Sequence, residues 1–136
     1  MSRIVPVMRL DEATGQTIHL IRAYAADVIT VGTQQLTGPC LVAPATVIAQ
    51  WYSGELADLS EAHLELLWPL APEVVLLGTR LPGQRASPAV RSAFSQRGVA
   101  LETMDLGAAC RTYNVLAQED RAVVAALFPG TTPLRP

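Results

Sequence analysis

The feature that most constrains the fold is a strand, helix and strand pattern in the second half of this 136-residue chain. The run 74–78 (VVLLG) is apolar without alternation, as in a strand covered on both faces. Ser87 followed by Pro88 predicts the start of a helix, and Gly98 predicts its end. Residues 99–103 predict the next strand. Because strands joined in this way run parallel, the pattern predicts a right-handed βαβ unit.

The other elements follow from shorter patterns. Asp58 and Glu61 have the spacing of a capping box, and apolar residues then recur at helical spacing until Pro69. The first half of the chain instead predicts a largely antiparallel group of short strands. We expect strands over 17–24, 27–31, 40–43 and 46–51, a turn over 32–38, and two final helices over 108–116 and 119–128.

Length and composition predict a single α/β domain. Half of the residues are hydrophobic and 16% are charged, so burial can offset the entropy of the chain. We expect a β-rich part over about 1–55, the βαβ unit and further helices over about 56–130, and a proline-rich tail over 131–136. The N-terminus lacks the apolar core of a signal peptide, and no apolar stretch is long enough to span a bilayer. The chain is therefore expected to be cytoplasmic, without a transmembrane segment.

Charge and residue usage argue against several classes of function. The net charge of −2 gives no general attraction to phosphate backbones, so no nucleic-acid partner is expected. Cys40 and Cys110 lack CxxC spacing, and His19 and His63 are isolated, so no metal site or cofactor is expected. No GxSxG motif is present, and we expect no catalytic residues.

The βαβ unit predicts where a ligand site would lie. The carboxyl ends of parallel strands share one rim, and loops at that rim form the usual ligand crevice of open α/β sheets. An anion there could use free amides at a helix start, together with an arginine. The alternative is structural, with Asp105 capping the helix and the glycines serving as turn residues. The candidate rim residues are Gly78, Thr79, Arg80, Asp105, Gly107, Cys110 and Arg111.

Cys110 has two interpretations. In the first turn of a helix, the dipole and Arg111 could lower the pKa of its thiol and make it reactive. A buried structural cysteine is the interpretation that we favour, because no base is found beside it in the sequence. By the same reasoning, we expect His63 to be packed on the apolar face of its helix. We expect Tyr113 to bury its ring and satisfy its hydroxyl locally.

Three sequence blocks resemble a known family. They are 72–79 (PEVVLLGT), 98–105 followed by 107–114 (GVALETMD, GAACRTYN), and, more loosely, 41–44 (LVAP) before Trp51. They are similar to a family of small, mostly uncharacterised bacterial and archaeal α/β domains. This family includes the third assembly factor of mitochondrial respiratory complex I. The chain departs from the family pattern at Arg80, where glycine is usual, and at Leu106, where a hydroxyl residue is usual.

The resemblance implies a fold and a role. The fold is a three-layer domain around a mixed five-stranded sheet, with flanking helices and a β-hairpin layer. The implied role is protein assembly without a known catalytic activity. The leading hypothesis is therefore a non-enzymatic interaction protein whose partners are subunits of a membrane-bound respiratory complex, with a peripheral position on the inner membrane as one option.

Three alternatives stay open at this point. The first is a small anionic-ligand site, or a weak enzyme, at the Gly78, Asp105 and Gly107 rim. The second is a thiol-dependent role for Cys110. The third concerns oligomeric state, because apolar residues near the proline-rich tail leave a homodimer open.

Overall fold

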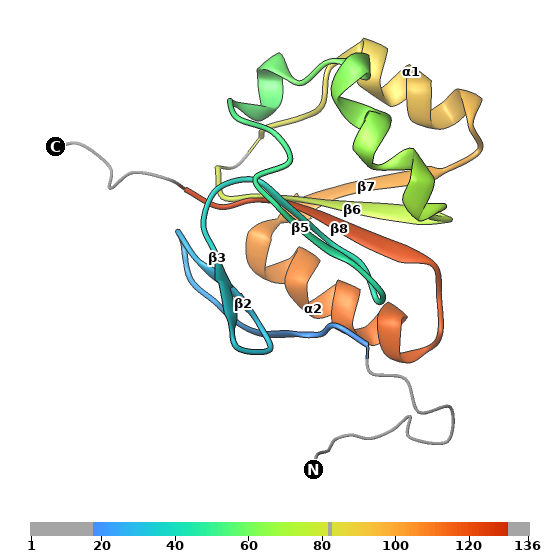
Figure 1. Ribbon diagram of the computed structural model, residues 1–136. Coiled ribbons are helices and arrows are strands. Elements are labelled where there is room, and N and C mark those ends of the chain that lie inside the picture. The colour runs from blue at the N-terminus through green and yellow to red at the C-terminus, as the bar shows by residue number, and fades with distance from the viewer. Residues whose placement is uncertain (1–17, 82, 131–136) are drawn as a thin grey trace, which may run out of the picture.

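A mixed five-stranded sheet forms the middle of three layers (Figure 1). The computed structural model describes residues 18–81 and 83–130. One face of the sheet is covered by α1 (Pro88–Gln96) and three short 3-10 helices, η2 (Leu56–Asp58), η3 (Glu61–Leu66) and η4 (Trp68–Leu70). The other face is covered by α2 (Leu106–Gln118) and a three-stranded sheet. The fold class expected from the resemblance is confirmed.

The strand order of the central sheet is β5-β4-β8-β6-β7. Its members are β4 (Cys40–Val42), β5 (Val47–Ala49), β6 (Val74–Thr79), β7 (Ala100–Asp105) and β8 (Val123–Phe128). β6 lies between β7 and β8 and runs parallel to both, whereas β4 is antiparallel to β8 and β5. The βαβ unit predicted from the sequence is therefore confirmed as β6, α1 and β7.

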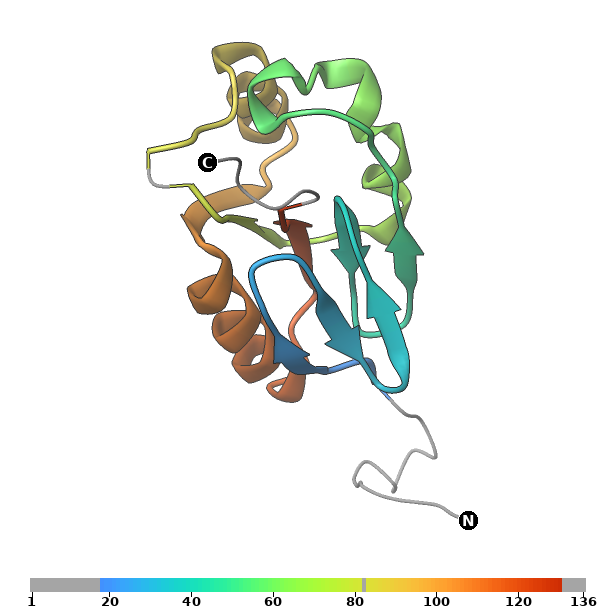
Figure 2. The same ribbon diagram turned by 90° about the vertical axis from the view of Figure 1, so that its left-hand side faces the viewer.

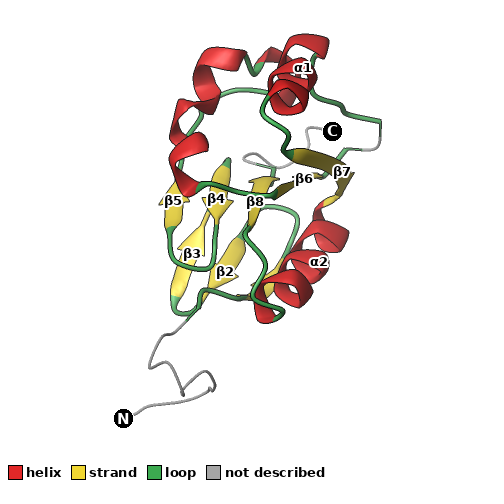
Figure 3. Cartoon of the chain, turned by 90° about the vertical axis from the view of Figure 1, so that its right-hand side faces the viewer, coloured by secondary structure: helices red, strands yellow, loops and turns green. Residues whose placement is uncertain are grey.

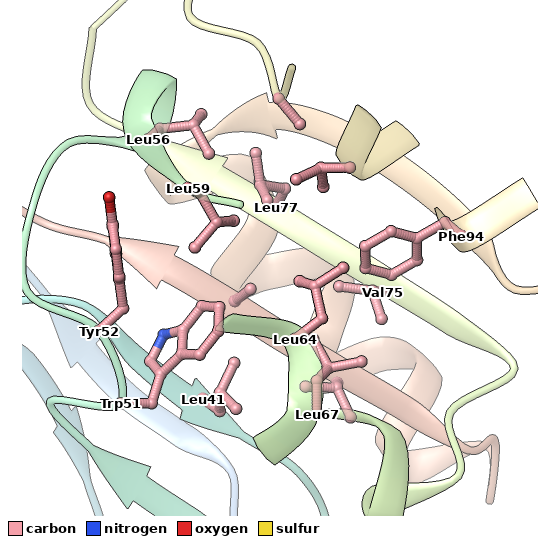
Figure 4. Packing of buried hydrophobic residues seen from close by; sticks show 14 of the residues in the cluster. Leu41, Trp51, Tyr52, Leu56, Leu59, Leu64, Leu67, Val75, Leu77 and Phe94 are labelled. Atoms are coloured by element: carbon pink, nitrogen blue, oxygen red, sulfur yellow. The ribbon is translucent and has the colours of Figure 1, made fainter. Parts of the chain in front are cut away.

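Alternating side chains of the central strands enter two separate cores. Val75 and Leu77 of β6 face α1 and the 3-10 helices, whereas Val74 and Leu76 face α2. All six residues of β6 are buried, because a strand covered on both faces has no polar side. Figure 4 shows the first core, in which Leu64 and Leu67 of the helical layer meet Val75 and Phe94.

The caps of α1 follow the sequence prediction. The Ser87 hydroxyl accepts a hydrogen bond from the Val90 amide at 3.3 Å, and Pro88 occupies the first turn. Gly98, just beyond the helix, has a φ of 71°, which glycine adopts without strain. Val90 and Phe94 of this helix are buried against the sheet.

The predicted final helix over 119–128 is wrong, because residues 123–128 form β8. All six residues of this strand are buried on both faces, so they lack the alternation that marks a half-buried strand. Two alanines in the run also favour a helix on intrinsic propensity. Asp120, with a φ of 64°, lies just beyond the end of α2 and breaks the helical path. Residues 123–128 then form a strand because they are buried between β4 and β6.

The first half contains one more strand than expected. β1 (Ile21–Tyr24), β2 (Ile29–Val31) and β3 (Gln34–Leu36) form the antiparallel three-stranded sheet seen face-on in Figure 2. β3 lies inside the predicted turn 32–38, which was therefore wrong in part. Only Leu36 of this strand is buried, so its sequence carries almost no strand signal. The predicted start of β1 at Thr17 lies outside the described residues.

The predicted helix between Asp58 and Pro69 is replaced by the successive 3-10 turns η3 and η4. The cap is Ser60 rather than Asp58, and the Nδ1 atom of His63 accepts the Ser60 amide at 2.8 Å. His63 is therefore exposed on the surface rather than packed on an apolar face. Leu66 is 49% exposed, because the tighter 3-10 turn moves it off the buried face.

Candidate functional site

The two bends predicted to form a rim do meet. In the parallel register of β6 and β7, Thr79 lies opposite Asp105 at the carboxyl ends of the two strands. Gly78–Arg80 and Asp105–Gly107 therefore lie beside one another at one edge of the central sheet. Open α/β sheets bind their ligands at this edge.

A hollow of about 320 Å³ opens at this rim. One wall comes from the ends of β6 and β7 and the first residues of α2, as predicted. The opposite wall is the turn between β1 and β2, which the sequence did not connect with the rim. The hollow is lined by Tyr24, Ala25, Ala26, Thr79, Arg80, Asp105, Leu106 and Gly107.

Asp105 caps α2. Its Oδ1 atom accepts a hydrogen bond from the Ala108 amide at 2.8 Å, so one amide at the helix start is already engaged. This is the structural role that the sequence offered as the alternative to anion binding. The carboxylate adds negative charge to the same end of the helix, where it complements the helix dipole.

Gly107 makes room for a tyrosine and an arginine. The Nη1 atom of Arg111 donates to the hydroxyl of Tyr24 at 2.6 Å. A Cβ atom at Gly107 would lie 3.0 Å from that hydroxyl and 3.1 Å from Nη1, which is tighter than normal packing. The open side of Gly107 therefore receives the Tyr24 phenol, so the close approach that a glycine permits is made by the protein itself.

Arg80 lines the hollow, and its side chain lies against Gly130. A Cβ atom at Gly130 would overlap the Arg80 side chain, so a larger residue there would require that side chain to move. The Gly130 amide donates to the Ala26 carbonyl at 2.7 Å. The segment after β8 is thus tied to the β1–β2 turn on one side of the hollow, and Arg80 packs on this junction.

Gly78 and Cys110 lie beneath the rim and do not line the hollow. A Cβ atom at Gly78 would lie 2.7 Å from the Ala109 Cβ, so Gly78 lets α2 approach β6. Cys110 is 1% exposed and lies in the second turn of α2, not the first. Burial raises the pKa of its thiol to about 12, although Arg111 lowers it in part. A thiol of that kind stays protonated and inert at neutral pH, which agrees with the buried cysteine that we favoured.

The polar residues of the 111–114 block hold the N-terminal segment. The side-chain amide of Asn114 accepts from the Ile21 N–H and donates to the Ile21 C=O, both at 2.8 Å. The Tyr113 hydroxyl donates to the His19 carbonyl at 2.6 Å. The hydroxyl of Tyr113 is thus satisfied 94 residues away in the sequence, not locally as expected. These contacts place β1 beside α2, and with it the Tyr24 wall of the hollow.

Ser60 and His63 are a serine and a histidine within hydrogen-bonding distance of one another. The Ser60 Oγ lies 3.0 Å from the His63 Nδ1, but the same nitrogen accepts the Ser60 amide at 2.8 Å. The lone pair that a general base needs is therefore engaged in a helix cap. Within residues 18–81 and 83–130, no three histidine, cysteine or acidic side chains gather as a metal site would require. No helix in these ranges is both long and apolar enough to cross a membrane.

Sequence reasoning missed half of the hollow. Tyr24, Ala25, Ala26 and Leu106 all line it, and none was a candidate. Leu106 could have been predicted, because it lies between the candidates Asp105 and Gly107 in the sequence. For the β1–β2 turn no local signal exists, because its position depends on contacts made by residues 111–114 about 90 residues later.

Comparison with known proteins identifies the family. The sequence profile described as "Protein of unknown function (DUF498/DUF598)" matches residues 21–128, from the start of β1 to the end of β8. The chain belongs to this family. The resemblance inferred from the sequence is therefore confirmed, and the family's extent includes the hollow and the 111–114 block.

The chain is also similar to individual proteins and to solved structures. The chain is 39% identical over 111 residues to mouse NADH dehydrogenase [ubiquinone] 1 alpha subcomplex assembly factor 3, covering 80% of this chain and 60% of that protein. An NMR structure from Xanthomonas campestris matches at 33% identity with a TM-score of 0.79, covering 95% of this chain and 98% of that one. A crystal structure from Bordetella parapertussis matches at 33% identity with a TM-score of 0.77, covering 85% and 99%.

Proposed function

We propose that this chain is a protein-binding domain that assists assembly of a membrane-bound respiratory complex without catalysing a reaction. The observation that carries the proposal is the 39% identity to an NADH dehydrogenase assembly factor over 80% of this chain. The chain spans 60% of the length of that relative, so the proposal concerns the shared domain. A cytoplasmic location at the membrane surface belongs to the same proposal.

The state of the reactive side chains supports a binding role. Cys40 and Cys110 are buried, and burial raises the pKa of both thiols to about 12. His63 caps a 3-10 helix, and Asp105 caps α2. Groups that a catalytic mechanism would need are thus engaged in holding the fold.

We place the partner contact at the rim hollow. Tyr24, which lines the hollow, is 42% exposed although its side chain is large and apolar. Leu81, the residue after Arg80 in the chain, is also large, apolar and 42% exposed. Arg80 adds a guanidinium to the lining of the hollow. Tyrosine and arginine are the residue types that most often dominate binding energy at protein interfaces. A partner segment that buries an apolar side chain beside a carboxylate would fit this surface.

Isolation of the tagged chain from its native host tests the proposal. We expect subunits of the respiratory NADH dehydrogenase to co-purify after cross-linking, and deletion of the gene to lower the amount of assembled complex on native gels. Recovery of other proteins alone would not support the proposal. Normal assembly in the deletion strain, with no respiratory subunit recovered, would overturn it.

Two surface variants test the location. Arg80→Glu and Leu81→Ser should reduce recovery of the subunits, because they change the charge and the apolar surface at the hollow. Arg85→Glu and Leu66→Ser are matched controls, since both side chains are exposed and neither residue adjoins a lining residue in the sequence, as Leu81 adjoins Arg80. Circular dichroism must show that all four variants are folded. Equal recovery with all four would place the contact elsewhere on the domain.

A small anionic ligand is the second candidate, and the hollow itself favours it. Its volume of about 320 Å³ lies at the lower end of small-molecule sites, which span ~300–1,000 Å³. Arg80 would supply the charge. Inorganic phosphate and a set of carboxylates can be tested by thermal shift. At 100 times the Kd, linkage predicts about 2.7 kcal/mol of stabilisation, and no rise in melting temperature with any of them would exclude this candidate.

A further inference from the structure

The two margins of the central sheet are built differently. β5, at one margin, has three residues, whereas β7, at the other, has six. Natural proteins blunt edge strands by shortening them, by a bulge, or by lysine and proline on the edge. β5 is short in this sense. β7 pairs with β6 without a register break and contains no proline, so its one protecting feature of this kind is the charge of Glu102. Figure 3 shows β7 at the outer margin of the sheet.

The backbone of β7 presents free hydrogen-bonding groups on its outer side. The Ala100 amide donates to the Glu73 carbonyl at 3.2 Å, so the backbone of Ala100 faces β6. Since alternate residues of a parallel strand face the same neighbour, Glu102 also faces β6, and Leu101 and Thr103 face outward. Within the described ranges, no other strand pairs with this side.

The side chains agree with an open edge. Thr103 and Glu102 are exposed, and Leu101 is half-buried against the α1 side of the sheet. Glu102 is the one charged side chain within the strand before the capping residue Asp105. Six residues with unpaired backbone groups can template another strand, and Glu102 is the one interior charge that opposes this pairing.

We propose that a second copy of this chain pairs antiparallel with β7 across a two-fold axis, which joins two five-stranded sheets into one. Two-fold interfaces are self-complementary, so one open strand provides both halves of the contact. The proposal goes beyond the proposed function, since it concerns a different edge of the molecule from the rim hollow.

The sequence of β7 is compatible with pairing to itself. A two-fold axis normal to the sheet places one residue of the strand opposite its own copy. An axis through Leu101 or Thr103 pairs leucine with leucine or threonine with threonine, and both are favourable cross-strand pairs. Glu102 then lies opposite Ala100 or Met104 of the copy. An axis through Glu102 would set two carboxylates opposite one another, which is unfavourable.

The Thr103 amide donates a hydrogen bond to the copy in both allowed registers. With the axis through Thr103, its amide donates to the Thr103 carbonyl of the copy. With the axis through Leu101, it donates to the Val99 carbonyl of the copy. Val99 precedes Ala100, so by the same alternation its backbone faces away from β6. Its amide already donates to the Phe94 carbonyl at 3.0 Å, so the Val99 carbonyl is the group that would accept from the copy. Loss of the Thr103 amide therefore weakens either dimer.

The pairing should be weak and depend on concentration. A single pair of strands buries less than the ~1,600 Å² of a standard interface, and small interfaces are typical of transient contacts. Sedimentation velocity between about 10 μM and 1 mM covers the Kd range expected for such contacts. The weight-average mass of the full chain should rise from one chain mass toward two across this range.

A proline substitution tests the edge. Thr103→Pro removes the outward amide but leaves the hydrogen bonds to β6, because proline is accepted on the free side of edge strands. It should keep the mass at one chain at all concentrations. Thr103→Val retains the amide and should behave like the unmodified protein. Glu102→Gln should tighten the dimer several-fold, because the two carboxylates lie diagonally across the axis.

Amide exchange of the unmodified chain gives an independent readout if Thr103→Pro fails to fold. Exchange at Thr103 should slow with increasing concentration, whereas exchange at Glu102, which already pairs with β6, should not change. A single-chain mass at every concentration, or a dimer that persists in Thr103→Pro, would overturn the proposal. So would exchange at Thr103 that does not depend on concentration.

Discussion

Replacement of Asn114 by alanine measures how much of the architecture depends on one side chain. Asn114 makes two hydrogen bonds to the backbone of Ile21, both at 2.8 Å in a partly buried site. Each contributes about 1 kcal/mol net, and two backbone groups are left without a partner, at a cost of about 1 kcal/mol more. Alanine returns about 0.5 kcal/mol in helix propensity. The free energy of unfolding should therefore fall by about 2–3 kcal/mol.

Urea denaturation is the assay. The midpoint should fall by roughly 1 M with an unchanged m-value, since m is about 1–3 kcal/mol/M for small proteins. Asn114→Asp keeps the acceptor and loses the donor, so it should show an intermediate loss. The Ile21 amide should also exchange faster in Asn114→Ala. A fall of less than about 0.5 kcal/mol, the size expected of an ordinary surface substitution, would show that α2 does not hold β1 through this side chain.

Two further outcomes follow from buried groups near the rim. Gly78→Ala should lower the free energy of unfolding by about 1–3 kcal/mol in the same assay. The reason is that the new methyl would lie 2.7 Å from the Ala109 Cβ and 3.0 Å from a Leu127 methyl. An unchanged midpoint would contradict the close packing of α2 on β6. Burial raises the pKa of the Cys40 and Cys110 thiols from 9.0 to about 12, with the neighbouring Cys110 adding to the shift of Cys40. Stability should thus be full below about pH 9 and fall as the pH rises toward 12, since only the unfolded chain releases these protons; the decline should be smaller when both cysteines are replaced by alanine.

The parts of the fold that the sequence predicted correctly are those with local signals. Ser87, Pro88 and Gly98 bound α1 because caps act within one turn of the helix. The run 74–78 predicted a covered strand because it has no polar residue, and residues 99–103 completed the βαβ unit. From these elements alone the parallel rim followed.

The parts that were wrong depend on distant contacts. Residues 123–128 have the same unbroken apolar character as 74–78, but alanines made them resemble a helix. Only their place between β4 and β6 makes them a strand. The hollow was half predicted for the same reason. Arg80 and Asp105 lie on the βαβ unit, whereas the wall around Tyr24 depends on α2 side chains far along the chain.

The position of β8 also bears on biogenesis. This strand is the last within the described residues, yet it is inserted between β4 and β6, and no other strand pairing there joins the two halves of the sheet. Until residues 123–128 are synthesised, β4 and β6 both lack the strand that pairs with their inner edges, and unpaired strand edges are prone to aggregate. Completion of the sheet has to wait until residues 123–128 leave the exit tunnel, and a nonsense codon upstream of them would leave no foldable product.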